Sequence, residues 1–314
     1  MERRALGETG IELPVIGFGC GPNARLMVGD DEALRIETIK AALDGGIDYF
    51  DTAYAYGWGV SETNLGRALK ELGARPSIST KFCLQPEDLK DPRSAVLAGF
   101  EQSLERLGLD KVDVLLSHNR FARAHEEGEK MNVGALLNLE EVFGHNGVAS
   151  ALQELLDAGV IRTTGFTSFG GDPEAIAEAI ASGVFGSINA SFSLLNPSAA
   201  VEVGPEAEGA DYRRVISTAA GAGVGVMAIQ VLGRGILTGE GPSEGPGSRL
   251  IPTARRLGDS LVKTAIRYVI STPGVSTAIL GLSEPAHVAE AIAAVEMGHF
   301  GEAERHELEE AAIH

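Results

Sequence analysis

The sequence has few cysteines, few basic residues and no uninterrupted apolar segment. Its two cysteines, Cys20 and Cys83, do not make a disulfide framework, so a reducing compartment is the simplest setting. The 26 Lys and Arg residues stand against 44 Asp and Glu, and the net charge of -18 disfavours nucleic acid and anionic membranes as partners, because like charges repel. The expected ligand is a small molecule.

Targeting and membrane signals are also missing. The N-terminal stretch MERRALGETG has two arginines but no apolar segment behind them, unlike a secretory signal. The longest apolar stretch, 219–233, is interrupted by Gly221, Gly223, Gly225 and Gln230, so it is not expected to span a bilayer. These features predict a cytoplasmic protein.

Short β-branched runs alternate with longer helical segments along the chain. Their continuous apolar character indicates parallel strands that are covered by helices. The predicted strands are 15–19, 47–51, 77–82, 112–118, 161–168, 187–192, 224–230 and 276–282. Eight strand-helix units predict a single (β/α)8 TIM barrel domain over residues 1–314. A doubly wound open sheet is the alternative, but GFGCGPNA matches its GxGxxG fingerprint only in part.

Capping residues bound several of the predicted helices. The expected starts and stops are Asp30 or Asp31 to Gly45-Gly46, Ser61 to Gly73, and Asp91-Pro92 to Gly108, with a further helix over 151–158.

Three segments lie outside the bare repeat. LGETGIELP predicts an N-terminal β-hairpin that caps the bottom of the barrel, with its turn at residues 8–10. Long loops are expected after strands four and seven, at 119–147 and 239–248. Both follow the carboxyl ends of strands, which form the catalytic face of such barrels.

Polar side chains end three consecutive predicted strands. Asp51, Lys81 and His118 lie at the ends of the second, third and fourth strands, and Tyr56 follows in the loop after Asp51. This set predicts proton transfer to or from an oxygen, because a lysine cation lowers the pKa of a nearby phenol from about 10. Asp51 is expected to hold Lys81, and a neutral His118 to orient a carbonyl. Each residue alone would more often be a structural polar group.

The chain resembles the aldo-keto reductase family. DTAYAYG followed by SETNLGRAL is similar to the family signature, STKF to its lysine strand and VDVLLSH to its histidine strand. The likeness continues through LLDAGVIRTTGFTSF, INASFSLLNP, VLGRGILTG and ILGLSEPAHVAEAI, so it covers nearly the whole chain. The resemblance implies a barrel that binds a nicotinamide cofactor without a Rossmann domain and transfers hydride to carbonyls.

The resemblance also implies individual roles. Tyr56 would be the general acid, Lys81 the modulator of its pKa, Asp51 the partner of Lys81, and His118 the group that orients the substrate. Trp58 and Asn119 are assigned to the substrate mouth, with loop packing as the alternative for Trp58.

The cofactor segments depart in part from the family pattern. Thr167 and Ser168 stand where a Ser-Asn pair is usual, and Asn189 replaces a Gln. An aliphatic run replaces the usual aromatic residue after the seventh strand. The implied cofactor residues are Thr167, Ser168, Asn189, Gln230, Val231, Leu232, Gly233, Arg234, Gly235, Gly281, Leu282, Ser283 and Glu290.

The cofactor is NAD or NADP, and local charge favours NAD. Glu284 stands where NADP-preferring members usually supply a cation, and no Lys or Arg occurs between Gly281 and Glu304. Arg249, Arg255 and Arg256 are the alternative contacts to a 2'-phosphate.

Three functions are open at this point. The leading one is an NAD(P)-dependent oxidoreductase that acts on an aldehyde, a ketone or an aldose. The second is a catalytically slow, cofactor-sensing binding subunit of a larger complex. The third is a metal-dependent hydrolase, which the lack of CxxC-type spacing and of an HxH pair disfavours, so no metal site is expected. The substrate, the direction of reaction and the oligomeric state cannot be read from the sequence.

Overall fold

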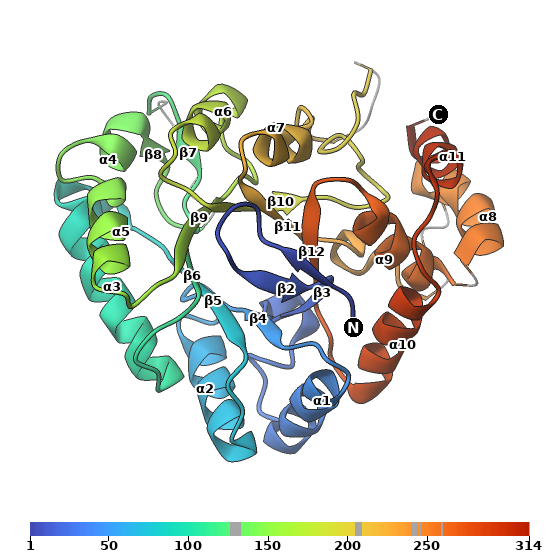
Figure 1. Cartoon of the computed structure of the whole chain (residues 1–314), viewed down its shortest axis with the longest axis horizontal. Coiled ribbons are helices and arrows are strands. Elements are labelled where there is room, and N and C mark those ends of the chain that lie inside the picture. The colour runs from blue at the N-terminus through green and yellow to red at the C-terminus, as the bar shows by residue number, and fades with distance from the viewer. Residues whose placement is uncertain are drawn as a thin grey trace.

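The computed structural model describes residues 1–125, 133–204, 209–239, 241, 244, 246–258 and 260–313, without the side chains of 246, 247 and 258. Eight parallel strands close into a barrel in this part of the chain (Figure 1). In order around the barrel they are β3 (Ile16–Gly19), β4 (Tyr49–Asp51), β5 (Ser77–Phe82), β6 (Val114–Ser117), β9 (Thr163–Thr167), β10 (Ser187–Ser191), β11 (Gly225–Ile229) and β12 (Val275–Leu280).

Each of these strands begins and ends within two residues of a predicted strand. The predicted barrel is therefore confirmed, and the open-sheet alternative is excluded because β12 pairs with β3. Within the described residues, no helix is both long and apolar enough to cross a bilayer.

Helices form a ring around the barrel (Figure 1). They are α1 (Glu32–Asp44), α2 (Val60–Leu72), α3 (Pro92–Leu107), α4 (Leu139–Phe143), α5 (Val148–Asp157), α6 (Pro173–Ala181), α7 (Val215–Gly221), α8 (Pro246–Gly258), α9 (Leu261–Ser271), α10 (Pro285–Glu296) and α11 (Glu302–Ile313). Short 3-10 turns occur at η1 (Pro22–Ala24), η2 (Pro86–Lys90) and η3 (Gly233–Gly235).

Most predicted helix ends match the structure, but two starts differ, and one of these is the helix predicted over 151–158, which begins at Val148. The Asp31 and Asp91 side chains accept backbone N–H groups at the starts of α1 and α3, and Gly108 ends α3 with a φ of 65°. The expectation that Ser61 caps α2 is wrong, because the helix begins after Gly59 and Ser61 lies inside its first turn. The Ser61 hydroxyl instead donates to the Cys20 carbonyl, which joins α2 to the barrel wall.

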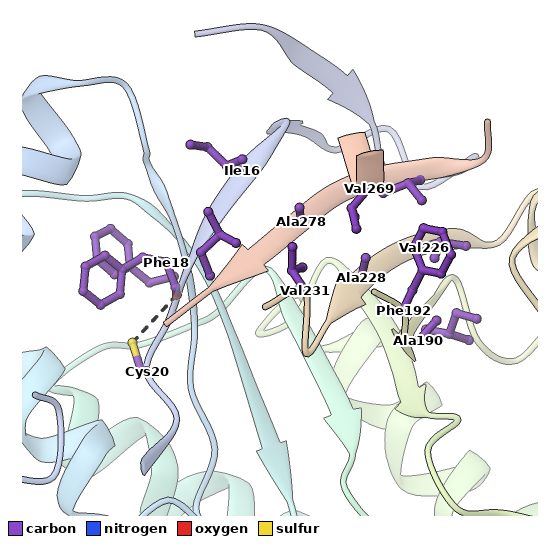
Figure 2. Packing of buried hydrophobic residues seen from close by; sticks show 14 of the residues in the cluster. Ile16, Phe18, Cys20, Ala190, Phe192, Val226, Ala228, Val231, Val269 and Ala278 are labelled. Atoms are coloured by element: carbon purple, nitrogen blue, oxygen red, sulfur yellow. Dashed lines mark hydrogen bonds between the residues drawn. The ribbon is translucent and has the colours of Figure 1, made fainter. Parts of the chain in front are cut away.

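The main hydrophobic core lies between the outer face of the barrel and the helices. Figure 2 shows Phe18, Ala278 and Ala228 on neighbouring strands and Phe192 just after the end of β10, with Val269 of α9 packed near them. All five side chains are buried. Burial of this layer fixes each strand's outward face and leaves the alternate residues to fill the barrel interior.

The N-terminal hairpin closes the bottom of the barrel, as predicted. Its strands β1 (Arg3–Ala5) and β2 (Glu12–Pro14) pair antiparallel, and Leu6, Ile11 and Leu13 join the interior cluster of the barrel. Gly7 allows the hairpin to approach the backbone at Gly223 closely, because a Cβ atom at Gly7 would lie 2.3 Å from the Gly223 carbonyl oxygen. The φ of Gly7 is 54°, which also favours glycine.

The described part of the insertion after β6 has more regular structure than the loop predicted at 119–147. It contains two short parallel strands, β7 (Phe121–Ala122) and β8 (Leu137–Asn138), and the helix α4, with Phe121, Leu137 and Val142 buried. Residues 126–132 of this loop lie outside the described residues. So do 240, 242, 243 and 245 of the second predicted loop, 239–248, in which α8 already begins at Pro246.

Candidate active site

Asp51 and Lys81 form a buried ion pair inside the barrel rim. Side chains alternate between the two faces of a strand, so Asp51 shares the inward face of Tyr49, which belongs to the interior cluster. Ser79 pairs in register with Asp51, and Lys81 lies two residues after Ser79, so Lys81 points inward as well. The Lys81 Nζ atom donates to Asp51 Oδ2 at 2.7 Å and to the Thr52 carbonyl at 2.8 Å. The two side chains are only 1% and 2% exposed, so water does not screen their attraction.

Tyr56 completes this group from the turn after β4. Its Oη atom lies 3.3 Å from Lys81 Nζ. The turn is held from both sides, because the Tyr54 N–H donates to the Lys81 carbonyl and the Tyr56 N–H to the Ala53 carbonyl. We call Asp51, Tyr56 and Lys81 the β4–β5 side of the rim.

The charge state of this group follows from burial and partners. Burial opposes the charge on Lys81, but the Asp51 carboxylate and the Tyr56 hydroxyl raise the pKa of Lys81 above its ordinary value, so it stays an ammonium. Burial raises the pKa of Tyr56 above its ordinary value, and the Lys81 cation pulls it down by less. The expectation of a lowered phenol pKa is therefore wrong in direction: Lys81 acts as predicted, but desolvation outweighs it.

His118 follows β6 and faces the phenol. The two rings meet edge to face with their centroids 5.5 Å apart. Burial, with the Lys81 charge adding to it, lowers the pKa of His118 to about 3, so the imidazole is neutral at physiological pH. Its Nδ1 atom has no hydrogen-bond partner among the described residues. A neutral imidazole beside the phenol can donate a hydrogen bond to an oxygen that both residues face.

The opposite part of the rim carries unpaired polar atoms. Asn189 of β10 pairs in register with Thr167 of β9 on one side and with Met227 of β11 on the other. Met227 belongs to the interior cluster, so the side chains of Thr167 and Asn189 also point into the barrel. In the part of the chain that the structure describes, Thr167 Oγ1 and Asn189 Oδ1 are buried without a hydrogen-bond partner. The neighbouring Ser168 hydroxyl donates to the Asn189 carbonyl at 3.2 Å. We call Thr167, Ser168 and Asn189 the β9–β10 side.

The unpaired atoms fit a carboxamide. A hydroxyl both donates and accepts, and an amide oxygen accepts from an NH₂ group. Buried polar atoms are rarely left unpaired in folded proteins, so two on adjacent strands at one rim indicate a site for a polar ligand.

The loop after β11 lies beside this side of the rim. Gln230 takes a left-handed φ of 61°, and its Oε1 atom accepts a hydrogen bond from Ser191 of β10 at 2.7 Å. Val231 is buried, and Leu232 leads into η3. Within η3, Arg234 is also left-handed, between Gly233 and Gly235, and its guanidinium stacks 5.3 Å from the centre of the Phe169 ring. Gln230 thus anchors the loop through Ser191, a contact that the sequence did not indicate.

The segment after β12 leads into the N-terminus of α10. Gly281, the buried Leu282 and Ser283 precede Glu284, the N-cap residue, whose side chain makes no capping hydrogen bond. His287, which no sequence motif singled out, accepts from the Ser283 N–H at 3.4 Å and lies 3.7 Å from Glu284.

Two predicted adenosine contacts already have partners within the protein. Glu290 accepts a hydrogen bond from Ser260 at the start of α9. Arg256 pairs with Glu307 of α11.

The two predicted substrate residues lie in different environments. Trp58 is 63% exposed, has a φ of 53°, and meets the Tyr54 ring edge to face. Asn119 is fully buried, and its amide binds the backbone of Leu84 and Ala135 with three hydrogen bonds of 2.8 Å. Asn119 therefore anchors the loop, whereas Trp58 is largely exposed to solvent.

The cysteines and potential metal ligands do not gather. Burial raises the pKa of both thiols, to about 11 for Cys83 and further for Cys20. Among the residues described here, no three His, Cys, Asp or Glu side chains lie close enough to hold a metal ion.

Comparisons with known proteins agree with this fold. The model of the aldo/keto reductase family matches residues 15–313, and the chain therefore belongs to this family of oxidoreductase enzymes. L-galactose dehydrogenase of Arabidopsis thaliana is 29% identical over 94% of this chain and 88% of its own. D-threo-aldose 1-dehydrogenase of Pseudomonas sp is 26% identical over 90% of both chains.

A solved structure extends the likeness to three dimensions. An aldo-keto reductase from Bacillus halodurans, in its holo form, matches with a TM-score of 0.77 and 23% identity. The match covers 99% of this chain and 96% of that one, and it supports the barrel fold.

Proposed function

We propose that the protein is an NAD(P)-dependent oxidoreductase that transfers hydride between a nicotinamide and a carbonyl or alcohol, with Tyr56 as the general acid or base. The observation that carries the proposal is the contact of the Tyr56 hydroxyl with an ammonium that a buried carboxylate holds in place. This arrangement is suited to giving a proton to an oxygen and taking it back.

The residues of the rim divide the chemistry among them. A bound nicotinamide would supply or accept the hydride. Tyr56, which keeps its proton at neutral pH, donates it to the carbonyl oxygen as negative charge grows there. Lys81 stabilises the phenolate that remains, and Asp51 keeps Lys81 in place. The neutral His118 donates a second hydrogen bond to the same oxygen and fixes its direction.

The β9–β10 side would hold the nicotinamide amide. Thr167 Oγ1 and Asn189 Oδ1 supply the hydrogen-bonding atoms, and Ser168 supports Asn189 through its carbonyl. Gln230, Val231, Leu232 and η3 would cover the ring from the β11 loop, with an aliphatic surface in place of an aromatic one.

We infer a preference for NAD over NADP from the segment after β12. Gly281, Leu282 and Ser283 would line the pyrophosphate, where backbone N–H groups at the start of α10 favour an anion. Glu284 stands at this helix start, and a carboxylate repels a 2'-phosphate. Glu290 would then reach the adenine only after exchanging its bond with Ser260.

The substrate class is an aldehyde, a ketone or an aldose. The two dehydrogenases named above, L-galactose dehydrogenase and D-threo-aldose 1-dehydrogenase, support the aldose in particular. The intact hydrogen-bonded group at Tyr56 favours turnover over the slow, cofactor-sensing role that the sequence left open.

Steady-state assays test the proposal. Absorbance of the reduced nicotinamide is followed with NAD or NADP against a panel of aldoses and alcohols, and with NADH or NADPH against aldehydes and ketones. The expected result is turnover with NAD that exceeds turnover with NADP. Exchange of Glu284→Lys should reduce this difference. Binding of a nicotinamide without turnover of any compound would contradict the enzymatic role.

A further inference from the structure

A chain of buried hydrogen bonds continues below the ion pair into the barrel. Asp51 Oδ2 binds Lys81, while Asp51 Oδ1 accepts a hydrogen bond from Ser79 Oγ at 2.6 Å. Ser79 Oγ in turn lies 2.8 Å from the hydroxyl of Tyr49. Tyr49 and Ser79 are fully buried, so this contact is not exchanged for water.

Counting protons fixes the direction of the chain. A carboxylate accepts and does not donate, so the single proton of Ser79 goes to Asp51. The Ser79 oxygen must then accept from Tyr49, because a hydroxyl has only one proton to give. Every donor therefore points from the barrel interior toward Asp51, and Lys81 points to Asp51 from the other side.

We propose that Ser79 and Tyr49 are positioning residues that orient the Asp51 carboxylate and, through it, the Lys81 ammonium against Tyr56. The inference rests on the proposed function and deepens it. With both oxygens of Asp51 occupied, the carboxylate has one orientation, and Lys81 Nζ has one place to lie. Without Ser79, Asp51 Oδ1 would be buried without its hydroxyl partner, and the ion pair would be weaker.

Tyr49 is fitted to be a permanent donor. Burial, followed by the nearby Asp51 charge, raises the pKa of Tyr49 well above its ordinary value, so it keeps its proton. The ring lies against Gly17, where a Cβ atom would be 2.7 Å from Tyr49 Cδ1. Met227 Sδ lies 2.9 Å from the same hydroxyl but is a weak acceptor, so the Ser79 oxygen takes the proton.

The titratable and charged groups around these hydrogen bonds come from several elements. Cys20 after β3, Tyr56 after β4 and Lys81 of β5 lie near Asp51, His118 after β6 lies near Lys81 and Tyr56, and Asp113 acts on Tyr49 from before β6. Cys20 and His118 are neutral at physiological pH, because burial raises the pKa of the thiol and lowers that of the imidazole. Lys81 is thus the cation that governs the phenol.

The pH dependence of alcohol oxidation tests the proposal. Oxidation needs the phenolate, so the logarithm of kcat rises with pH until the phenol has lost its proton. When Asp51 no longer holds the Lys81 ammonium against Tyr56, the phenolate is stabilised less, so in Ser79→Ala this rising limb of the pH profile should move to higher pH by about 0.5–1 unit. At a fixed pH below the limb, kcat should fall by about 3–10-fold, with unchanged affinity for NADH by fluorescence quenching. Tyr49→Phe should move the limb in the same direction by less.

Ser187→Ala is the matched control. Ser187 is a fully buried serine of β10. Its hydroxyl donates to the Thr164 carbonyl and takes no part in the hydrogen bonds from Tyr49 to Asp51. Its loss should lower stability without moving the limb. An unmoved limb in both Ser79→Ala and Tyr49→Phe would overturn the positioning role while the wild-type enzyme still turns over.

A double-mutant cycle in urea unfolding gives a second readout that needs no turnover. We compare the factor by which Ser79→Ala changes the unfolding constant in the wild-type protein with the factor in the Asp51→Asn variant. The second factor should be at least about threefold smaller, since the two side chains interact directly. Equal effects in both backgrounds would contradict the coupling. A wild-type protein that oxidises or reduces nothing would overturn the proposed function, and this inference with it.

Discussion

The two sides of the barrel rim differ in how their buried polar atoms are paired. On the β4–β5 side, the Lys81 ammonium and both oxygens of Asp51 have partners within the chain. On the β9–β10 side, Thr167 Oγ1 and Asn189 Oδ1 have none among the described residues. The first side is therefore organised by folding itself, whereas the unpaired atoms of the second side support our proposal that it binds a ligand. Substitutions in the ion pair of the first side should harm stability and catalysis, and those on the second side should mainly weaken cofactor affinity.

The largest effect is expected for Lys81→Met. Removing the ammonium leaves the Asp51 carboxylate buried and unpaired, so the free energy of unfolding should fall by about 3–5 kcal/mol and activity should be lost. Urea unfolding measures the change, and adding Asp51→Asn should restore part of it. The exposed pair of Lys40 and Asp44 is the control: Lys40→Met should cost less than about 1 kcal/mol. Similar losses in the two variants would break the comparison.

Tyr56→Phe should abolish proton transfer while leaving the fold intact. We expect kcat to fall by roughly 10²–10⁴-fold with little change in the dissociation constant of the nicotinamide. Tyr54→Phe is the matched control, because Tyr54 lies in the same turn and contacts Arg106 and Trp58 through its ring, which phenylalanine retains. Equal kcat values for wild type and Tyr56→Phe would remove Tyr56 from the mechanism.

His118 should make stability depend on pH. Its pKa is about 3 in the folded protein and 6.5 ordinarily, so below about pH 6.5 the unfolded chain binds a proton that the folded protein does not. Stability therefore falls as pH drops, by about 2 kcal/mol at about pH 5, and it is unaffected by this group above pH 7. The difference between wild type and His118→Asn in urea unfolding isolates the effect. A constant difference across this range would show that His118 titrates normally.

Thr167→Val is expected to have the smallest effect and the most specific one. Valine has the same shape and removes a hydroxyl that has no partner in the described structure, so stability should change by less than about 0.5 kcal/mol. Affinity for the nicotinamide should weaken about 5–10-fold.

Thr80→Val is the mirrored control for this substitution. The Thr80 hydroxyl donates to the buried Glu62 carboxylate, so its loss should lower stability by about 1.5–3 kcal/mol without changing cofactor affinity. The same pattern in both variants would mean that the β9–β10 side is structural.

The barrel could be predicted from the sequence because each strand is a mostly continuous apolar run that can be recognised from its own residues. Strand ends then located Asp51, Lys81 and His118, since parallel strands end at one rim. The direction of the Tyr56 pKa shift was missed, because desolvation depends on what surrounds the phenol in space. Ser79 was missed for a related reason: it lies in the middle of a strand, where only the barrel brings it to Asp51.

Loops were the least predictable part of the chain. Asn119 sits at a strand end like His118, but its neighbours Leu84 and Ala135 come from distant positions in the sequence, so its anchoring role could not be read locally. Ser61 has the chemistry of an N-cap, yet the left-handed Gly59 starts the helix earlier. In both cases tertiary contacts override a local preference.

The hairpin at the start of the chain has a practical consequence. Arg3 pairs with Asp48, just before β4, and Arg4 donates to the carbonyl of Val275 at the start of β12, so residue 1 emerges on the face of the molecule away from Tyr56. A linker attached there would hold the enzyme on an electrode or bead with its open mouth toward the medium. A sensor built that way should keep substrate diffusion unobstructed.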